Sequence, residues 1–133
     1  AALSRKVLEC LQFGTPSITI WGDGEQTRSF MYIEDCLKGT IDLMNSEYQQ
    51  PLNLGSAESI SINDLVSLLE GFANIKLERF YSTDAPKGVN GRNSDNTTIL
   101  KVLDWEPKTS LSEGMLITFN WIKSELENVN KVA

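Results

Sequence analysis

The sequence predicts an α/β domain, for three reasons. Segments with apolar residues at helical spacing alternate along the chain with short segments rich in β-branched residues. Glycine, proline and asparagine separate these segments where the chain must turn. The length of 133 residues, 41% of them hydrophobic, suits one domain with its own core but is short for a complete cofactor enzyme. We therefore expect one α/β unit across residues 1–133.

The first expected elements are a helix and a strand. Residues 1–13 have an amphipathic pattern, with apolar side chains at helical spacing on Leu3, Val7, Leu8 and Leu11. Gly14 and Pro16 follow this pattern and should end the helix. Residues 17–21 then alternate β-branched and polar side chains, which predicts a short strand.

A glycine-rich turn and a second helix come next. The turn covers residues 22–24, and residues 26–33 should continue as an extended segment. Helical spacing returns over residues 34–44, on Cys36, Leu37, Ile41 and Met44. This segment therefore predicts a helix.

The middle of the chain predicts two strands with a helix between them. Residues 51–55 are a short apolar segment that ends on glycine, which is typical of a strand. Ser61 and Asp64 have the spacing of a capping box, and the helix that they open should run to about Phe72. Residues 76–82 alternate in polarity and contain aromatic residues near their end, so we expect a strand there.

The last third predicts a loop and two helices. Residues 84–96 are rich in proline, glycine and asparagine and should form a loop before a short helix at 97–103. Ser110 and Glu113 form a full capping box. The final helix should bury one face, made of Leu116, Phe119, Ile122 and Leu126. Because the strands are few and scattered, we expect some of them to complete a larger sheet that this chain lacks.

Composition excludes several classes of protein. The net charge of −6 argues against a nucleic-acid-binding protein, which needs a basic face to neutralise phosphates. No apolar run approaches the roughly 20 residues of a membrane-spanning helix, and residues 1–13 lack the pattern of a secretory signal. We therefore expect a cytoplasmic protein with no membrane partner.

The side chains available for catalysis are also limited. The chain has no histidine, which excludes Ser-His and Cys-His catalytic pairs and the usual histidine ligands of zinc. We expect no metal site. Cys10 and Cys36 lack CxxC spacing and should be reduced, half-buried thiols.

The first candidate binding segment is 21–30. Gly22 and Gly24 permit a tight turn, after which the chain extends and presents Arg28 from a strand edge. An arginine held in this way suits a phosphate, because its fork of donors matches two oxygens at once. The alternative is a hairpin turn with a surface arginine.

The second candidate is the polar loop 88–96, which contains Arg92 and Asp95. Arg92 has no evident structural duty, and polar loops on a rigid scaffold often carry binding residues. Asp95 or Asn96 could instead cap the helix that follows, and a plain loop remains the alternative. Together, Arg28 and Arg92 could offset both charges of a diphosphate, which one arginine cannot do.

These motifs resemble, in their order, the extended short-chain dehydrogenase/reductase family of NAD-dependent nucleotide-sugar epimerases and dehydratases. WGDGEQTRSF followed by YIEDC is similar to the family segment whose arginine holds the diphosphate of the nucleotide sugar. LNLGSAESISINDL and GRNSDNTTILKVLDWEPKTSLSEGM resemble two later segments of the family. The resemblance covers residues 4–123, nearly the whole chain.

The resemblance implies a fold and a set of ligand-binding residues. Residues 1–133 would be the C-terminal, nucleotide-sugar-binding portion of a Rossmann-type enzyme, with a small sheet and several helices but without the Rossmann core. Arg28 and Arg92 would bind the diphosphate of a GDP- or UDP-sugar. Further contacts to the ligand would come from Gln26, Thr27, Lys6 and Asp95, the last of them near the ribose.

The cofactor-binding and catalytic motifs of the family are not found in this sequence. It has no GxxGxxG loop for NAD and no Tyr-x-x-x-Lys pair for hydride transfer. A missing N-terminal half would therefore hold NAD and the catalytic residues, and this chain alone should be inactive. The resemblance also implies a homodimer of the complete enzyme.

Several functions stay open on the sequence alone. The chain could be the substrate-binding portion of an epimerase or of a nucleotide-sugar 4,6-dehydratase. It could also be a non-catalytic nucleotide-sugar-binding module. In the last alternative, it is a structural or partner-binding domain in which both arginine motifs are only turns.

Overall fold

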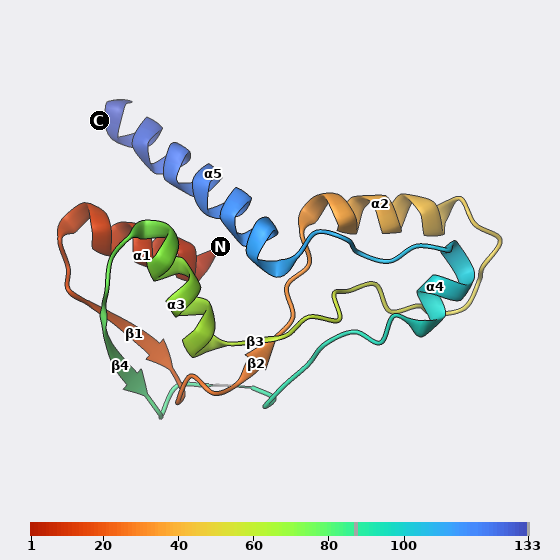
Figure 1. Cartoon of the computed structure of the whole chain (residues 1–133), viewed down its shortest axis with the longest axis horizontal. Helices are drawn as coiled ribbons and strands as arrows, with labels where there is room; N and C mark the ends of the chain where they lie inside the picture. Colours follow the sequence, from red (N-terminus) through yellow and green to blue (C-terminus); the bar gives the residue numbers. More distant parts are fainter. Residues whose placement is uncertain (87, 133) are drawn as a thin grey trace.

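The computed structural model describes residues 1–86 and 88–132, with side chains through Val129. Figure 1 shows one group of elements at one end of the molecule, formed by α1, α3, β1 and β4 with α5 across it. A second group, formed by α2 and α4, lies at the other end, and β2 and β3 lie between the two. The elements in chain order are α1 (Ala2–Phe13), β1 (Ser17–Trp21), β2 (Thr27–Arg28), α2 (Ile33–Met44), β3 (Ile60–Ser61), α3 (Ile62–Ala73), β4 (Glu78–Ser82), α4 (Thr97–Leu103) and α5 (Leu111–Val132).

The strands of the described residues form two separate two-stranded sheets. β1 and β4 are parallel, with Ser17 opposite Glu78 and Trp21 opposite Ser82. β2 and β3 are antiparallel and pair over only two residues each. This arrangement agrees with the expected α/β class and its small sheet.

The main core lies between β1 and three helices. α1 contributes Val7 and Leu8, and β1 contributes Ile18 and Ile20. α3 and α5 supply most of the rest, with Phe119 of α5 only 2% exposed and in edge-to-face contact with Phe72 at 5.8 Å. The remaining buried members of this core are Leu65, Val66, Leu69, Leu77, Met115 and Ile122.

A second, smaller cluster packs α2 against the segment around α4. Trp105 and Ile99 are buried but lie outside the main core. A Cβ added to Gly39 of α2 would lie 2.6 Å from atoms of both Leu54 and Trp105, so only glycine allows this close approach. Lys38 also lies over the Trp105 ring, at 5.5 Å from its centroid.

Most of the expected elements are confirmed. Ser61 accepts a hydrogen bond from Asp64 N at 3.0 Å, so the predicted cap of α3 is present. Ser110 likewise accepts from Glu113 N at 3.3 Å, at the start of α5. Gly14 adopts a left-handed φ of 65° and ends α1, as its position predicted. Both cysteines are free and partly buried.

Three expectations about elements were wrong or too broad. Residues 51–55 are not a strand, and the partner of β2 is Ile60–Ser61. The extended segment expected at 26–33 is a strand only at Thr27–Arg28, and α2 begins at Ile33. The strand expected at 76–82 begins at Glu78.

Two apolar residues expected on buried helix faces are exposed. Leu116 is 41% exposed, and its neighbour Met115 is buried in its place. Leu11 of α1 is 43% exposed. Helical periodicity allows either of two adjacent faces, and the position of the packing partner selects one of them.

One face of α2 is apolar and uncovered. Ile33, Leu37, Ile41 and Met44 lie along it at helical spacing and are 54% to 78% exposed. Leu52 and Leu54, by contrast, are partly buried within the chain. Contiguous apolar surface of this kind is seldom left in contact with water.

We therefore expect the isolated chain to self-associate through α2. Replacing Leu37 and Ile41 together by glutamate should shift its sedimentation toward the monomer, because two charges would interrupt the apolar face. Leu100→Glu, at a leucine of α4 that is 42% exposed, is the matched control and should leave association unchanged. A wild-type chain that stays monomeric at high concentration would contradict this prediction.

No helix among the described residues has both the length and the apolar character needed to span a membrane.

Candidate functional site

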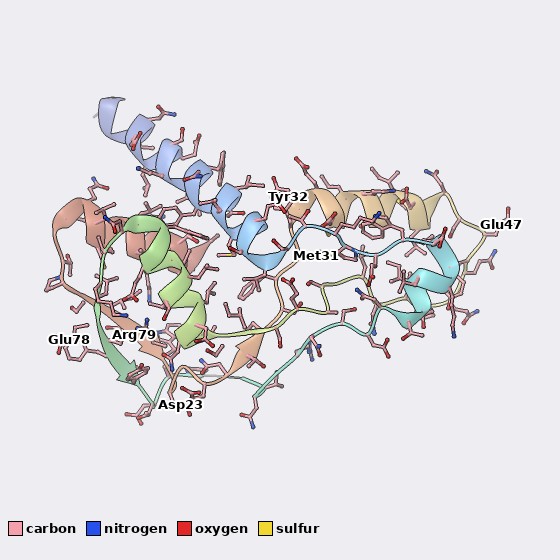
Figure 2. All side chains as sticks on the ribbon, in the orientation of Figure 1. Asp23, Met31, Tyr32, Glu47, Glu78 and Arg79 are labelled. Carbon is pink, nitrogen blue, oxygen red and sulfur yellow. The ribbon has the colours of Figure 1, made fainter. Side chains whose placement is uncertain are left out.

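The turn after β1 is held in place by the side chain of Asn63. Gly22 and Gly24 have φ values of 77° and 79°, which favour glycine. Asn63, at the start of α3, donates its side-chain amide to Glu25 Oε1 at 2.7 Å and to the Asp23 carbonyl at 3.3 Å. Figure 2 shows Asp23 at the tip of this turn. The turn is therefore a fixed support for the residues that follow it.

Gln26 belongs to this support. It is 8% exposed, and its Nε2 donates to the Trp21 carbonyl at 2.8 Å. Its Oε1 is buried without a hydrogen-bond partner among the described residues. The predicted ligand residue Gln26 thus lies inside the turn.

Three extended segments meet beyond the turn. Ser56 accepts two hydrogen bonds at its carbonyl, from Ser29 Oγ at 2.7 Å and from Ser94 N at 3.1 Å. Thr27 N donates to the Asn90 carbonyl at 2.8 Å. These bonds bring segments 27–29, 53–57 and 88–94 side by side, although they lie far apart in the sequence.

Arg28 and Arg92 line the same open hollow, which has a volume of about 420 Å³. The other lining residues are Ser29, Asn53, Leu54, Gly55, Asn93 and Ser94, so the described lining contains no acidic side chain. In a chain with net charge −6, this hollow is a local site of positive charge. Such a site attracts an anion, and two guanidinium groups can offset two negative charges.

The two arginines are held differently. Arg28 Nη1 donates to the Thr27 carbonyl at 2.7 Å and to the Val89 carbonyl at 2.8 Å. The side chain of Arg92 is exposed and has no hydrogen-bond or ion-pair partner in the part of the chain that the structure describes. Arg28 is therefore fixed in place, and Arg92 remains available to a ligand.

Lys6 lies in a different hollow. Its Nζ donates to the Thr19 carbonyl at 3.3 Å, beside Cys10 and Phe13 along the edge of β1. Burial raises the pKa of the Cys10 thiol, and Glu9 raises it further, while Lys6 opposes them. The thiol therefore stays protonated near neutral pH and donates to the Ser17 carbonyl.

The N-cap residue of α4 is Asn96, and its side chain makes no capping hydrogen bond. The residue before it, Asp95, supports the start of the helix: Asp95 Oδ1 accepts from Thr97 N at 2.9 Å and from Thr97 Oγ1 at 2.6 Å. These two bonds lower the pKa of the Asp95 carboxyl. Asp95 lines a neighbouring hollow that shares Asn53 with the arginine hollow. Asn96 instead donates its side-chain amide to Glu106.

Sequence reasoning did not single out several lining residues. Three of them lie within the two arginine motifs: Ser29, Asn93 and Ser94. Their position next to the arginines in the sequence could have identified them as lining residues. Asn53 lies in the segment that was expected to be a strand, where no signal pointed to a ligand. Within the described residues, no group of cysteine and acidic side chains could hold a metal ion.

Comparison with known proteins now defines the family. The sequence pattern of the NAD dependent epimerase/dehydratase family matches residues 1–55. GDP-mannose 3,5-epimerase of Arabidopsis thaliana is 41% identical over 96% of this chain. The chain belongs to this family. It spans 32% of the length of that relative.

Solved structures agree with this family. UDP-glucose 4-epimerase of Thermotoga maritima, solved with UDP-glucose, matches 95% of this chain with a TM-score of 0.82 at 28% identity, over 40% of its own length. UDP-glucuronic acid 4-epimerase of Bacillus cereus, solved with UDP-glucuronic acid and NAD, matches 92% of this chain with a TM-score of 0.80 at 28% identity, over 40% of its own length. The fold is therefore that of the corresponding part of the family's nucleotide-sugar enzymes.

Proposed function

We propose that residues 1–133 are the nucleotide-sugar-binding domain of an NAD-dependent epimerase, and that Arg28 and Arg92 hold the diphosphate of its substrate. The observation that carries this proposal is that both arginines line one open hollow without an acidic neighbour in its described lining. The similarity to GDP-mannose 3,5-epimerase favours a GDP-sugar over a UDP-sugar as the substrate.

The role of this domain is to bind and orient. A guanidinium group bonds two oxygens at once, so two of them fix both the position and the direction of a diphosphate. Binding energy from the diphosphate, far from the reacting carbon, can then hold the sugar in the geometry that the reaction needs. Asp95 borders the adjoining hollow, and its proposed role is to bind the ribose on one side of the diphosphate.

NAD does not fit this chain. The sequence has no glycine-rich loop between a strand and a helix that could bind its pyrophosphate. We therefore assign the NAD site and the catalytic tyrosine and lysine to a part of the enzyme outside these residues. That part is also the natural partner of the uncovered face of α2.

Substitution of either arginine by alanine tests the proposed function. In the complete enzyme, the affinity for the GDP-sugar should fall while the affinity for NAD stays the same. An unchanged affinity for the nucleotide sugar in both variants would rule out the shared-diphosphate site.

The isolated chain should be inactive. Purified residues 1–133 should neither convert a nucleotide sugar nor bind NAD tightly, because the groups for both tasks lie elsewhere. A coupled assay for epimerisation and a fluorescence titration with NAD measure these two properties. Robust turnover by the isolated chain would overturn the assignment of this chain as a binding domain only.

A further inference from the structure

The loop at residues 88–91 is attached to β2 by two consecutive carbonyl groups. The Val89 carbonyl accepts from Arg28 Nη1 at 2.8 Å, and the Asn90 carbonyl accepts from Thr27 N at 2.8 Å. Consecutive residues of the loop thus bond consecutive residues of the strand. The loop and β2 are therefore fixed relative to each other at this point.

The attachment also places Arg92. Asn90 is held to Thr27, and on the other side of Arg92 the Asn93 side chain donates to the Ala57 carbonyl at 3.0 Å. Arg92 lies between these two attachment points, and its own side chain makes no hydrogen bond to a described residue. The contacts of the loop therefore decide where the Arg92 guanidinium can reach.

Gly91 lies at the closest point between the loop and the strand. A Cβ added to Gly91 would lie 2.6 Å from Thr27 Oγ1, which is shorter than a carbon–oxygen contact allows. Thr27 is β-branched and stiff at χ1, and its backbone is held by pairing with Ser61 and by the bond to Asn90. An added methyl group therefore requires the loop or the Thr27 side chain to move, and the stiffness of Thr27 favours movement of the loop away from β2.

We infer that Gly91 is a positioning residue for the two arginines. Because it has no side chain, the loop at residues 88–91 can pack directly against Thr27. This inference rests on the proposed function of the hollow. The absence of a side chain at Gly91 allows the loop to approach β2 closely enough for the Val89 carbonyl to hold Arg28. The same approach brings Arg92 to the same hollow. Thr27 is not among the residues that line the hollow, and the role inferred for it here is to set the position of the loop.

A double-mutant cycle in the complete enzyme tests this inference. Gly91→Ala should weaken binding of the GDP-sugar about tenfold, because small displacements of binding groups have large effects on binding and catalysis. Thr27→Ala removes the obstacle, and its hydroxyl has no hydrogen-bond partner among the described residues. The double variant should therefore bind the GDP-sugar as tightly as Thr27→Ala alone.

Three further measurements separate positioning from general damage to the fold. Gly71→Ala is the matched control, because a Cβ at Gly71 has nothing within 4 Å and should leave the affinity unchanged. The affinity for NAD should be the same in all of these variants. In an enzyme that already carries Arg28→Ala and Arg92→Ala, Gly91→Ala should cause no additional loss of affinity, because its effect runs through the arginines.

The outcomes distinguish this inference from the proposed function. If the two arginine variants bind the GDP-sugar like the wild type, the proposed function fails. If they bind weakly but Gly91→Ala binds normally, the positioning role of Gly91 is wrong. The same holds if Thr27→Ala does not restore GDP-sugar binding in the Gly91→Ala variant. An equal loss of NAD and GDP-sugar affinity in Gly91→Ala would also overturn it.

Discussion

Replacing Arg92 by alanine in the complete enzyme should weaken nucleotide-sugar binding by roughly 1.5–3 kcal/mol, the scale for losing hydrogen bonds to a charged group. Arg28→Ala should lie at the upper end of this range, because Arg28 also bonds the Val89 carbonyl and so helps to hold the loop that carries Arg92. Isothermal titration with the GDP-sugar measures both effects. The loss in the double variant should be smaller than the sum of the two single losses, since the residues act on one ligand.

Lysine variants separate charge from geometry. Arg28→Lys and Arg92→Lys keep the positive charge but lose the planar fork, so they should recover only part of the lost affinity. Arg5→Ala is the matched control, because Arg5 is exposed on α1 and bonds Glu9 outside the hollow. Full recovery with lysine at both positions would contradict a paired contact to two phosphate oxygens.

Replacing Glu70 by alanine should destabilise the fold by about 3 kcal/mol, since it leaves the Leu77 N–H without an acceptor and the partly buried Arg79 without its carboxylate. The Glu70 side chain is 4% exposed and accepts from Leu77 N at 2.9 Å, Arg79 Nη2 at 2.9 Å and Lys76 Nζ at 3.0 Å. Figure 2 labels Arg79 on β4, the strand that this carboxylate ties to α3. Urea unfolding of the chain measures the loss.

The matched control is Glu78→Ala. Glu78 is exposed on β4, next to Arg79 (Figure 2), and should change the free energy of unfolding by less than about 0.5 kcal/mol. Equal losses in the two variants would show that the Glu70 carboxylate does not support the fold.

The contribution of Glu70 should depend on pH. Burial alone would raise the pKa of Glu70, but the hydrogen bonds from Leu77, Lys76 and Arg79 outweigh it and hold the pKa below its usual value. The folded state therefore binds the proton less readily than the unfolded state, so this stabilisation is complete above the unfolded pKa of about 4.3 and is lost as the pH falls through the folded pKa. The difference in stability between wild type and Glu70→Gln should shrink over the same range.

The sequence predicted correctly those features that depend on residues close together in the chain. The caps at Ser61 and Ser110, the left-handed glycine at Gly14 and the bounds of α4 all depend on residues within a few positions of each other. The arginine motifs were also visible as short patterns. Their shared hollow was a hypothesis until the fold placed Arg28 and Arg92 on one side of the molecule.

The errors occurred where distant segments compete for the same partner. Segment 51–55 is apolar enough for a strand, but β2 pairs with Ile60–Ser61, and Leu54 packs on Gly39 instead. On α5, periodicity permitted Leu116 or Met115 on the buried face, and the position of α1 and α3 selected Met115. Neither choice is encoded within a window of a few residues.

The sequence by itself determined the α/β class, the helices, the two arginine motifs and the lack of an NAD-binding loop, because each depends on residue type and short spacing. Only the tertiary structure decided that Asn90 and Val89 bind β2, that Gly91 meets Thr27, and that Gln26 lies buried in the turn. These contacts join residues more than sixty positions apart or depend on the depth at which a side chain packs. Such contacts are set by the free energy of the whole packed chain, which no short segment contains.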